Sequence, residues 1–316
     1  MLQLPFFKEL ELAGNVLIAG AGGGCDVLSG LPLFFALREA GKQVHLASLT
    51  FSNLRTASGD WLGPKLMEVT PDIMSPEAYF PERSLSRWFR DAGDEVPVYA
   101  FERGGVRPLV RSYQILADKL HLDTVIIADG GTDSLMRGDE FDLGTPEEDI
   151  SSVLAVNELT IERRLLVCLG FGVDVFHGIC HAQFLENVSA LIRNRAFRGA
   201  FTLTDDMPAV RAYQTATRAV LQEMPSEYAS IVCSSVMSAI DGHFGDHHAT
   251  GRTQGSRLFI NPLMSMYWCF DVAGVASQVL YREVARMTET VEELAQVISE
   301  FRSQCTTKRP WTDLAV

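Results

Sequence analysis

Short apolar runs bounded by glycine or polar residues recur along the first half of the chain. They are Asn15–Gly20, Gln43–Thr50, Val96–Glu102, Thr124–Ala128 and Arg164–Gly170. Runs of this length and apolar content are typical of strands buried on both faces of a parallel sheet. The segments between them space apolar residues at helical intervals over Asp26–Ala40, Pro108–Leu120 and Ile150–Arg163. This alternation predicts βαβ units with right-handed crossovers.

The second half of the chain has mostly helical periodicity. Helices are expected over Ala182–Arg195, Pro208–Glu223, Ser226–Ile240 and Thr290–Cys305. A short strand is expected at Phe201–Thr204, and Arg257–Phe270 could supply a last strand that Pro262 interrupts. The irregular pattern over residues 53–95 predicts a loop-rich segment with short helices. The pattern predicts one Rossmann-like, three-layer α/β domain over residues 1–316, with a mainly parallel sheet and helical additions in the C-terminal half.

Composition narrows the class of partner. The chain has 316 residues, 47% of them hydrophobic, and a formal net charge of −13 without a basic run. Such a charge disfavours nucleic acid and anionic membranes, and no stretch of about 18 apolar residues predicts a membrane span. Six cysteines without a CxxC pair and the lack of a signal peptide indicate a cytoplasmic protein. The apolar late helices could pack internally or form the face of a homo-oligomer.

A glycine-rich turn, with Gly20, Gly22, Gly23 and Gly24 as candidate ligand-binding residues, joins the first strand to the first helix. Glycines let the backbone approach a ligand, and the helix N-terminus offers N–H groups to an anion. Cys25 or Val27 stands where a dinucleotide fingerprint needs its third glycine, and no acid ends the second strand. A standard NAD site is therefore disfavoured. Asp26 could cap the helix, bind a hydroxyl group or hold a metal.

A second turn, Asp129-Gly130-Gly131-Thr132-Asp133, directly follows a buried strand. Acids at the carboxyl edge of a parallel sheet lie where ligands bind in open α/β folds, and Asp129 and the first glycine turn should share this edge. Asp129 and Asp133 could grip Mg²⁺ or another divalent metal, accept ribose hydroxyls or act as a general base, with Gly130, Gly131 and Thr132 beside the ligand. The alternative is an acidic turn in which Asp133 caps a helix.

A histidine-rich loop, Asp241–His248, is the third candidate. His247 or His248 could act as a catalytic acid or base, because histidine titrates near neutrality. The spacing matches no zinc motif, and a polar surface loop or a substrate lid explains it equally well.

Three further residues could line the same ligand pocket as the two glycine-bearing turns. Asp174 follows a strand end, and His177 comes three residues later. Asn261 interrupts an apolar run and could point into the crevice, although a bulge would also account for it. A helix start packed by its own histidines is the alternative for His177.

The segments AGAGGGCDVLSGLPL and ADGGTDSLMRGDE, with the histidine-rich DGHFGDHH, resemble an uncharacterised bacterial and archaeal family catalogued as a domain of unknown function. The likeness spans most of the chain. It implies a Rossmann-like α/β fold, and it implies neither an activity nor a catalytic residue.

These features favour an enzyme that hydrolyses or transfers a group of a nucleotide-like or phosphorylated small molecule. The glycines would hold the anion, Asp129 and Asp133 would bind a divalent ion, and His247 or His248 would supply acid or base. Without a metal, the carboxylates would bind hydroxyls instead. The alternative is a non-catalytic small-molecule-binding or sensor protein on the same scaffold.

Overall fold

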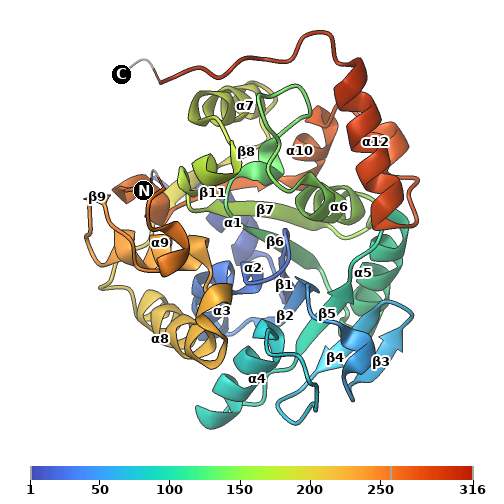
Figure 1. Cartoon of the computed structure of the whole chain (residues 1–316). Coiled ribbons are helices and arrows are strands. Elements are labelled where there is room, and N and C mark those ends of the chain that lie inside the picture. Colours follow the sequence, from blue (N-terminus) through green and yellow to red (C-terminus); the bar gives the residue numbers. More distant parts are fainter. Residues whose placement is uncertain (1, 257, 315–316) are drawn as a thin grey trace.

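The computed structural model describes residues 2–256 and 258–314, and its centre is a nine-stranded sheet (Figure 1). The strand order is β3-β4-β5-β2-β1-β6-β7-β11-β8. The five strands from β5 to β7 run parallel, and the pairings outside them are antiparallel. The strands are β1 (Asn15–Gly20), β2 (Gln43–Thr50), β3 (Asp60–Gly63), β4 (Leu66–Val69), β5 (Val98–Glu102), β6 (Thr124–Gly130), β7 (Arg163–Leu169), β8 (Phe197–Thr202) and β11 (Met266–Asp271). A separate two-stranded sheet pairs β9 (Gly245–Asp246) with β10 (Phe259–Ile260).

Helices cover both faces of the large sheet, which makes three layers (Figure 1). One face packs against α5 (Val106–Leu120), α6 (Pro146–Asn157), α7 (His181–Arg193), α10 (Val272–Gln278), α11 (Arg282–Ala285) and α12 (Val291–Gln304). The other packs against α1 (Pro5–Glu11), α2 (Asp26–Ser29), α3 (Leu31–Glu39), α4 (Pro81–Asp91), α8 (Pro208–Glu223) and α9 (Ile231–Ile240). Among the residues described, no helix has both the length and the apolar character needed to cross a membrane.

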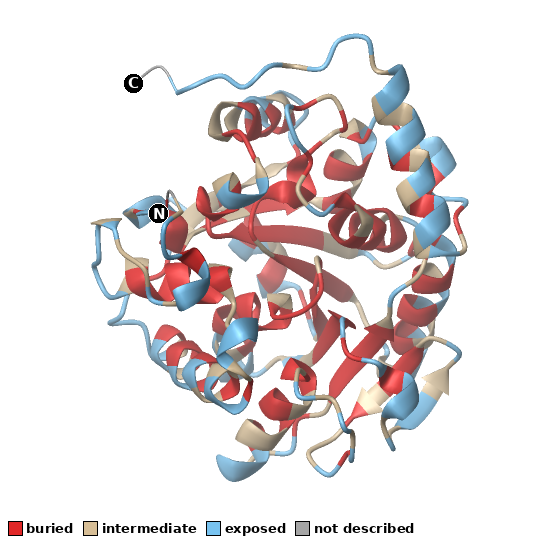
Figure 2. Ribbon diagram, in the orientation of Figure 1, coloured by how far each residue is buried: buried red, intermediate tan, exposed pale blue. Residues whose placement is uncertain are grey.

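Alternation along the buried strands divides the core between these two faces. In β1, Leu17 and Ala19 face the α5–α6 layer, whereas Val16 and Ile18 face the α2–α3 layer. All four are fully buried, and the middle of the sheet is buried on both sides (Figure 2). Burying apolar surface at about 25 cal/mol per Å² supplies the main stabilisation that such a sheet needs. The predicted α/β sandwich with a mainly parallel sheet is confirmed.

Several boundaries differ from the prediction. The helix expected over Asp26–Ala40 is divided into α2 and α3 at Gly30. The helix expected over Ile150–Arg163 begins four residues earlier as α6, and its predicted last residue starts β7 instead. The loop-rich segment contains β3 and β4, two short strands that extend the sheet, as well as α4.

The late apolar run also differs from the expectation. Its first residue, Arg257, lies outside the described residues. Pro262 starts the short 3-10 helix η6 (Pro262–Ser265), which separates β10 from β11. Proline lacks the N–H that a strand ladder needs, so the strand forms only after it. The expected short strand at Phe201–Thr204 is the end of the longer β8.

The order of the strands fixes where a ligand can bind. The chain passes from β1 to β2 and β5 on one side, then returns to place β6 and β7 on the other side of β1. The connections that leave the carboxyl ends of β1 and β6 therefore diverge to opposite faces. This divergence leaves a crevice at the edge of an open α/β sheet, which is where such folds bind ligands.

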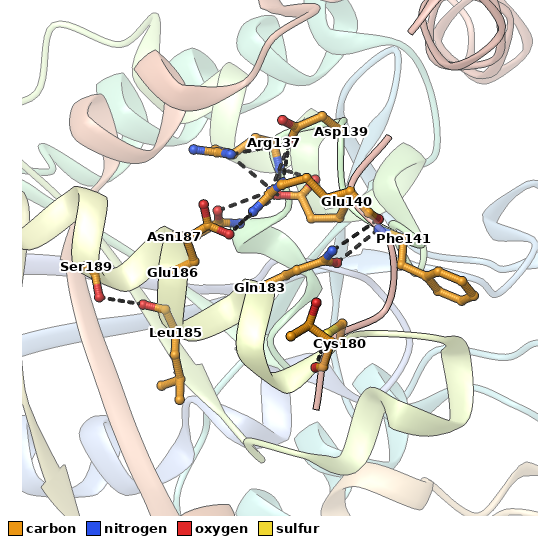
Figure 3. Close-up of polar contacts among 12 residues, drawn as sticks. Arg137, Asp139, Glu140, Phe141, Cys180, Gln183, Leu185, Glu186, Asn187 and Ser189 are labelled. Carbon is orange, nitrogen blue, oxygen red and sulfur yellow. Dashed lines mark hydrogen bonds and ion pairs between the residues drawn. The ribbon is translucent and has the colours of Figure 1, made fainter. Parts of the chain in front are cut away.

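The turn that follows this edge is held by the C-terminal segment. Glu140 is fully buried and accepts hydrogen bonds from the backbone N–H groups of Arg137 and Gly138 and from the side chain of Asn187. Arg309 in the C-terminal segment donates to the same carboxylate at 2.6 Å. Figure 3 shows these contacts converging on the turn beside α7. The buried carboxylate of Glu140 thus has hydrogen-bond donors from its own turn, from α7 and from the C-terminal segment, as a buried charge requires.

Gly30 offers a test of the packing at the α2–α3 break. A Cβ at this position would lie 2.4 Å from Cγ2 of Ile18, although its backbone angles suit any residue. We expect Gly30→Ala to lower the free energy of unfolding by about 1–3 kcal/mol, the usual cost of overpacking a core. Urea denaturation measures the change. Gly251→Ala is the matched control, since a Cβ there meets nothing within 4 Å. Equal stability of the Gly30→Ala variant and the unmodified protein would contradict this packing.

Candidate functional site

Five aspartates line a cavity of about 180 Å³ at the crevice between β1 and β6. They come from four connections at the same edge of the sheet: the turn after β1, the end of β6 with the loop after it, the first turn of α6 and the loop after β7. They are Asp26, Asp129, Asp133, Asp149 and Asp174. We call this space the aspartate cavity.

Three of these carboxylates form a compact cluster. Asp26, Asp129 and Asp149 each offer one oxygen, and these oxygens lie within 4.8 Å of one another. Asp26 begins α2, and Asp129 lies at the end of β6. The two glycine-bearing turns therefore meet at one edge of the sheet, as the sequence predicted. Asp149 belongs to the first turn of α6, where Pro146 and acidic residues suit the positive end of a helix.

Most of the aspartates are held by hydrogen bonds from their own turns. The donors are the N–H of Gly22 to Asp26 (2.7 Å), of Ser134 to Asp129 (3.3 Å), of Thr145 to Asp133 (2.9 Å) and of Thr132 to Asp174 (2.6 Å). Asp149 differs from the rest. Its Oδ2 accepts from the Thr145 hydroxyl at 3.1 Å, but its Oδ1 is buried without a hydrogen-bond partner.

Within the described part of the chain, no ion pair neutralises the aspartates, although Arg252 lines the same cavity. None of the ion pairs formed within residues 2–256 and 258–314 includes any of the five aspartates. Burial raises the pKa of Asp26 to about 7, with a further rise from the charge of Asp133. Burial also raises the pKa values of Asp129, Asp149 and Asp174 well above the ordinary range, and their neighbours' charges add to the effect. The cavity therefore needs either protons or a cation to be stable.

The glycines make room for these carboxylates. A Cβ on Gly22 would lie 2.6 Å from Oδ1 of Asp149 and 2.8 Å from Oδ2 of Asp26. A Cβ on Gly130 would lie 2.6 Å from the other oxygen of Asp26, and one on Gly131 would lie 2.6 Å from Asp174. Carboxylates of the chain itself therefore occupy the space beside these glycines.

Gly23 and Gly24 face a different wall. Both have positive φ angles, and a Cβ on either would collide with the aromatic ring of Phe51 or the hydroxyl of Tyr79. Gly20 ends β1 and packs against the backbone at Asp26 and Val27. The turn thus presents carboxylates on one side and aromatic rings on the other.

The structure brings most of the predicted site residues together. Gly22, Gly23, Gly24, Asp26, Asp129, Gly130, Asp133, Asp174 and His177 all line the aspartate cavity. Gly20, Gly131 and Thr132 lie in the turns behind it.

The other predicted residues lie elsewhere. Neither His247 nor His248 is among the residues that line the aspartate cavity. His247 stacks on His243 with ring centroids 3.8 Å apart, and His248 contacts Asp246 and Thr253. Asn261 caps the short helix η6 through the N–H of Leu263.

Asp149 and Arg252 are cavity residues that the sequence analysis missed. Asp149 stood just before the helix expected from Ile150, so the acids in Pro146-Glu147-Glu148-Asp149 were not examined as ligands. A helix start moved to the proline would have placed this acid at the carboxyl edge of the sheet. Arg252 comes from the far loop beyond α9, and no local pattern connects it with β1 or β6.

Residues 61–306 match the family described as "Protein of unknown function (DUF1152)". This match confirms the family resemblance noted from the sequence motifs. It includes Asp129, Asp149 and Asp174, whereas the Gly20–Asp26 turn precedes the matched residues. No curated protein matches the chain.

The raised pKa values predict a pH dependence of stability in a chelator such as EDTA. A carboxyl whose pKa is higher in the folded than in the unfolded chain stabilises fully at low pH, and this contribution is lost as the pH rises through the folded pKa. For Asp26 the window runs from the ordinary value of 3.8 to about 7. We expect the free energy of unfolding to fall over this window by about 1.4 kcal/mol per pH unit for each retained proton. Urea denaturation at several pH values measures it.

Two variants sharpen this test. Asp149→Asn removes a buried carboxyl whose pKa burial raises, so the variant should lose less stability between pH 5 and pH 8. Asp205→Asn, at an exposed aspartate, should behave like the unmodified protein. Identical pH profiles for Asp149→Asn and Asp205→Asn would contradict the electrostatic description of the aspartate cavity.

Proposed function

Since the chain belongs to the DUF1152 family, whose description assigns no activity, we propose a function from the chemistry of its aspartate cavity. The protein is a divalent-cation-dependent enzyme that hydrolyses or transfers the phosphoryl group of a nucleotide-like or phosphorylated small molecule. The observation that carries this proposal is the Asp26–Asp129–Asp149 cluster, in which one buried oxygen of Asp149 has no hydrogen-bond partner.

The ligand set favours a hard cation. All three members of the cluster offer carboxylate oxygens, which suit Mg²⁺ and Mn²⁺, whereas soft thiolate ligands select other metals. Mg²⁺ binds through a few carboxylates and keeps several water molecules for exchange with substrate oxygens. The unpartnered oxygen of Asp149 would then gain the partner that a buried charge requires.

The cation also explains how an anionic substrate could enter an acidic cavity. The N–H of Gly22 already donates to Asp26, so this glycine offers no free donor to a phosphate. A bound divalent ion would neutralise part of the aspartate charge and contact the phosphate oxygens. We therefore assign recognition of the anion to the cation, where the sequence had suggested the glycine backbone.

Asp133 and His177 are the candidates for proton transfer, because both line the aspartate cavity and neither belongs to the three-carboxylate cluster. In hydrolysis, a water oxygen bonds to phosphorus while the bond from phosphorus to the leaving oxygen breaks. The proton of the water passes to Asp133, and the leaving oxygen receives a proton from His177. In group transfer, the hydroxyl of an acceptor replaces the water.

Turnover separates this proposal from a sensor on the same scaffold. A sensor would bind the cation and the phosphorylated ligand without releasing phosphate or a transferred product.

The free state of all six cysteines and the acidic charge are consistent with a cytoplasmic protein that acts on a small molecule and not on nucleic acid or a membrane.

Cation binding is the first test. We expect Mn²⁺ to bind the unmodified protein, measured by calorimetry, and a hundredfold excess over Kd to add about 2.7 kcal/mol of stability. Asp129→Asn and Asp149→Asn should weaken the binding at least about tenfold, because each removes a ligand. Asp205→Asn is the control and should bind as the unmodified protein does. Equal Mn²⁺ affinity in all four proteins would refute the cation site.

Activity is measured on the same proteins by phosphate release from a panel of nucleotides and sugar phosphates, with Mg²⁺ or Mn²⁺ present. A rate that EDTA and Asp149→Asn abolish supports the enzyme. Cation-dependent binding of a panel member without any product would favour the sensor.

Gly22→Ala tests the close approach of the two carboxylates. Its Cβ would collide with Asp26 and Asp149, so these side chains must move apart. We expect Mn²⁺ affinity to fall about tenfold or more, with a melting temperature in EDTA within a few degrees of the unmodified protein. Gly251→Ala is again the matched control, and unchanged Mn²⁺ affinity in Gly22→Ala would show that the cation does not bind between these two carboxylates.

A further inference from the structure

A second and larger cavity lies next to the aspartate cavity. It has a volume of about 750 Å³ and is formed by α8, α9 and the loop that leads to η5 (Gly251–Thr253). Its walls combine apolar side chains such as Leu221 and Met237 with polar ones such as Gln222 and Ser238. A volume of this size is within the range of pockets that hold nucleotide-sized molecules. We call it the α8–α9 groove.

Arg252 lines both the aspartate cavity and the α8–α9 groove. Its exposed side chain and its backbone each donate one hydrogen bond. Its Nη1 donates to the carbonyl oxygen of Ala229 at 2.9 Å, and its backbone N–H donates to the hydroxyl of Thr250 at 3.2 Å. Tyr228, the residue before Ala229, packs at a tilt against Tyr79, a wall of the aspartate cavity, with ring centroids 5.3 Å apart. The two cavities therefore share Arg252, whose guanidinium group is bonded to Ala229.

The charge of Arg252 is free for a ligand. Within residues 2–256 and 258–314 it forms no ion pair, although five aspartates line the cavity beside it. Arg218, on the other side of the groove, is already paired with Asp241. Arg103, near the glycine turn, is paired with Glu148. Guanidinium groups bind phosphate through paired N–H donors, so an unpaired arginine at this junction suits a phosphoryl group.

We propose that the substrate is an organic phosphate that spans both cavities. Its phosphoryl group lies between the cation of the aspartate cavity and Arg252, and its organic part, of nucleoside or sugar size, occupies the α8–α9 groove. The hydroxyl and amide groups of the groove suit a polar organic part, and its apolar walls suit a ring. This inference rests on the proposed function, because it requires a cation at Asp26, Asp129 and Asp149.

The test uses the full chain loaded with Mn²⁺ and measures binding of three kinds of probe by calorimetry. The probes are inorganic phosphate, ribose 5-phosphate and the nucleoside 5′-monophosphates. We expect at least one organic phosphate to bind ten times more tightly than inorganic phosphate, because only the organic phosphates reach the groove. Equal affinity of inorganic phosphate and every organic probe would overturn the proposal.

Arg252 is tested by substitution. Arg252→Ala should weaken every phosphate probe at least tenfold, and Arg252→Lys should restore part of the loss, because lysine keeps the charge but not the paired donors. Arg193→Ala, at an exposed arginine of α7, is the matched control and should change nothing. Phosphate binding that survives Arg252→Ala unchanged would overturn the role of this residue.

The groove is tested separately by Ala249→Trp, which adds an indole at an exposed position in its wall. This variant should weaken the organic phosphates and leave Mn²⁺ and inorganic phosphate unaffected. Unchanged affinity for the organic phosphates would exclude the groove as their site. Mn²⁺ binding distinguishes the two proposals: if Mn²⁺ does not bind, the proposed function fails, and if Mn²⁺ binds but the Arg252 and Ala249 variants have no effect, only the inference about the substrate fails. Melting temperatures confirm that each variant is folded.

Discussion

Five aspartates at one edge of the sheet, four of them buried and Asp26 partly buried, are the constraint on which the rest of this structure depends. Their mutual repulsion and their loss of hydration oppose folding, and no arginine or lysine forms an ion pair with them among the described residues. The surrounding sequence fits this constraint. Glycine stands where a side chain would collide with a carboxylate, at Gly22 beside Asp149 and at Gly131 beside Asp174. The glycine turns and the aspartates are therefore one feature of the molecule.

The scaffold supplies the stability that this arrangement lacks. The strands that carry the site are buried on both faces, so the carboxyl ends of β1 and β6 cannot move apart without exposing core residues such as Ile18 and Ile126. The loop after β6 is held in addition by Glu140 (Figure 3), and the partners of Glu140 include Arg309 from the C-terminal segment. Glu140 is fully buried and, unlike the aspartates, has an arginine among its donors. The contrast shows that this fold can supply a counter-charge to a buried acid, and that among the described residues it forms no ion pair with the aspartates.

Local patterns were sufficient to predict the central strands, because apolar runs such as those of β1, β6 and β7 need no information from distant residues. β3 and β4 were not predicted, since each is only four residues long: β3 is partly exposed, and the buried apolar residues of β4 form too short a run to stand out. That the first glycine turn and Asp129 share one edge was predicted from the rule that parallel strands end at the same edge. Asp149 was missed because the start of its helix was placed one residue after it.

The choice among the histidines shows the limit of local reasoning. His247 and His248 form the denser cluster in the sequence, but their loop follows α9, and its position depends on how α8 and α9 pack on the sheet. His177 lines the aspartate cavity because its 3-10 helix directly follows β7, a strand of the parallel core. Distance along the chain from a core strand was thus a better guide than the number of histidines.

On the proposed function, the same electrostatics would set the order in which ligands bind. The chain has a net charge of −13, and each aspartate of the cavity that loses its proton would repel a phosphate within about 8 Å, the screening length at physiological salt. A divalent ion that binds first would offset two units of negative charge and give the unpartnered oxygen of Asp149 a partner. A phosphate would then meet the cation on one side and Arg252 on the other. On this proposal, selectivity for phosphorylated molecules is absent from the cation-free protein, and the cation that the aspartates require creates it.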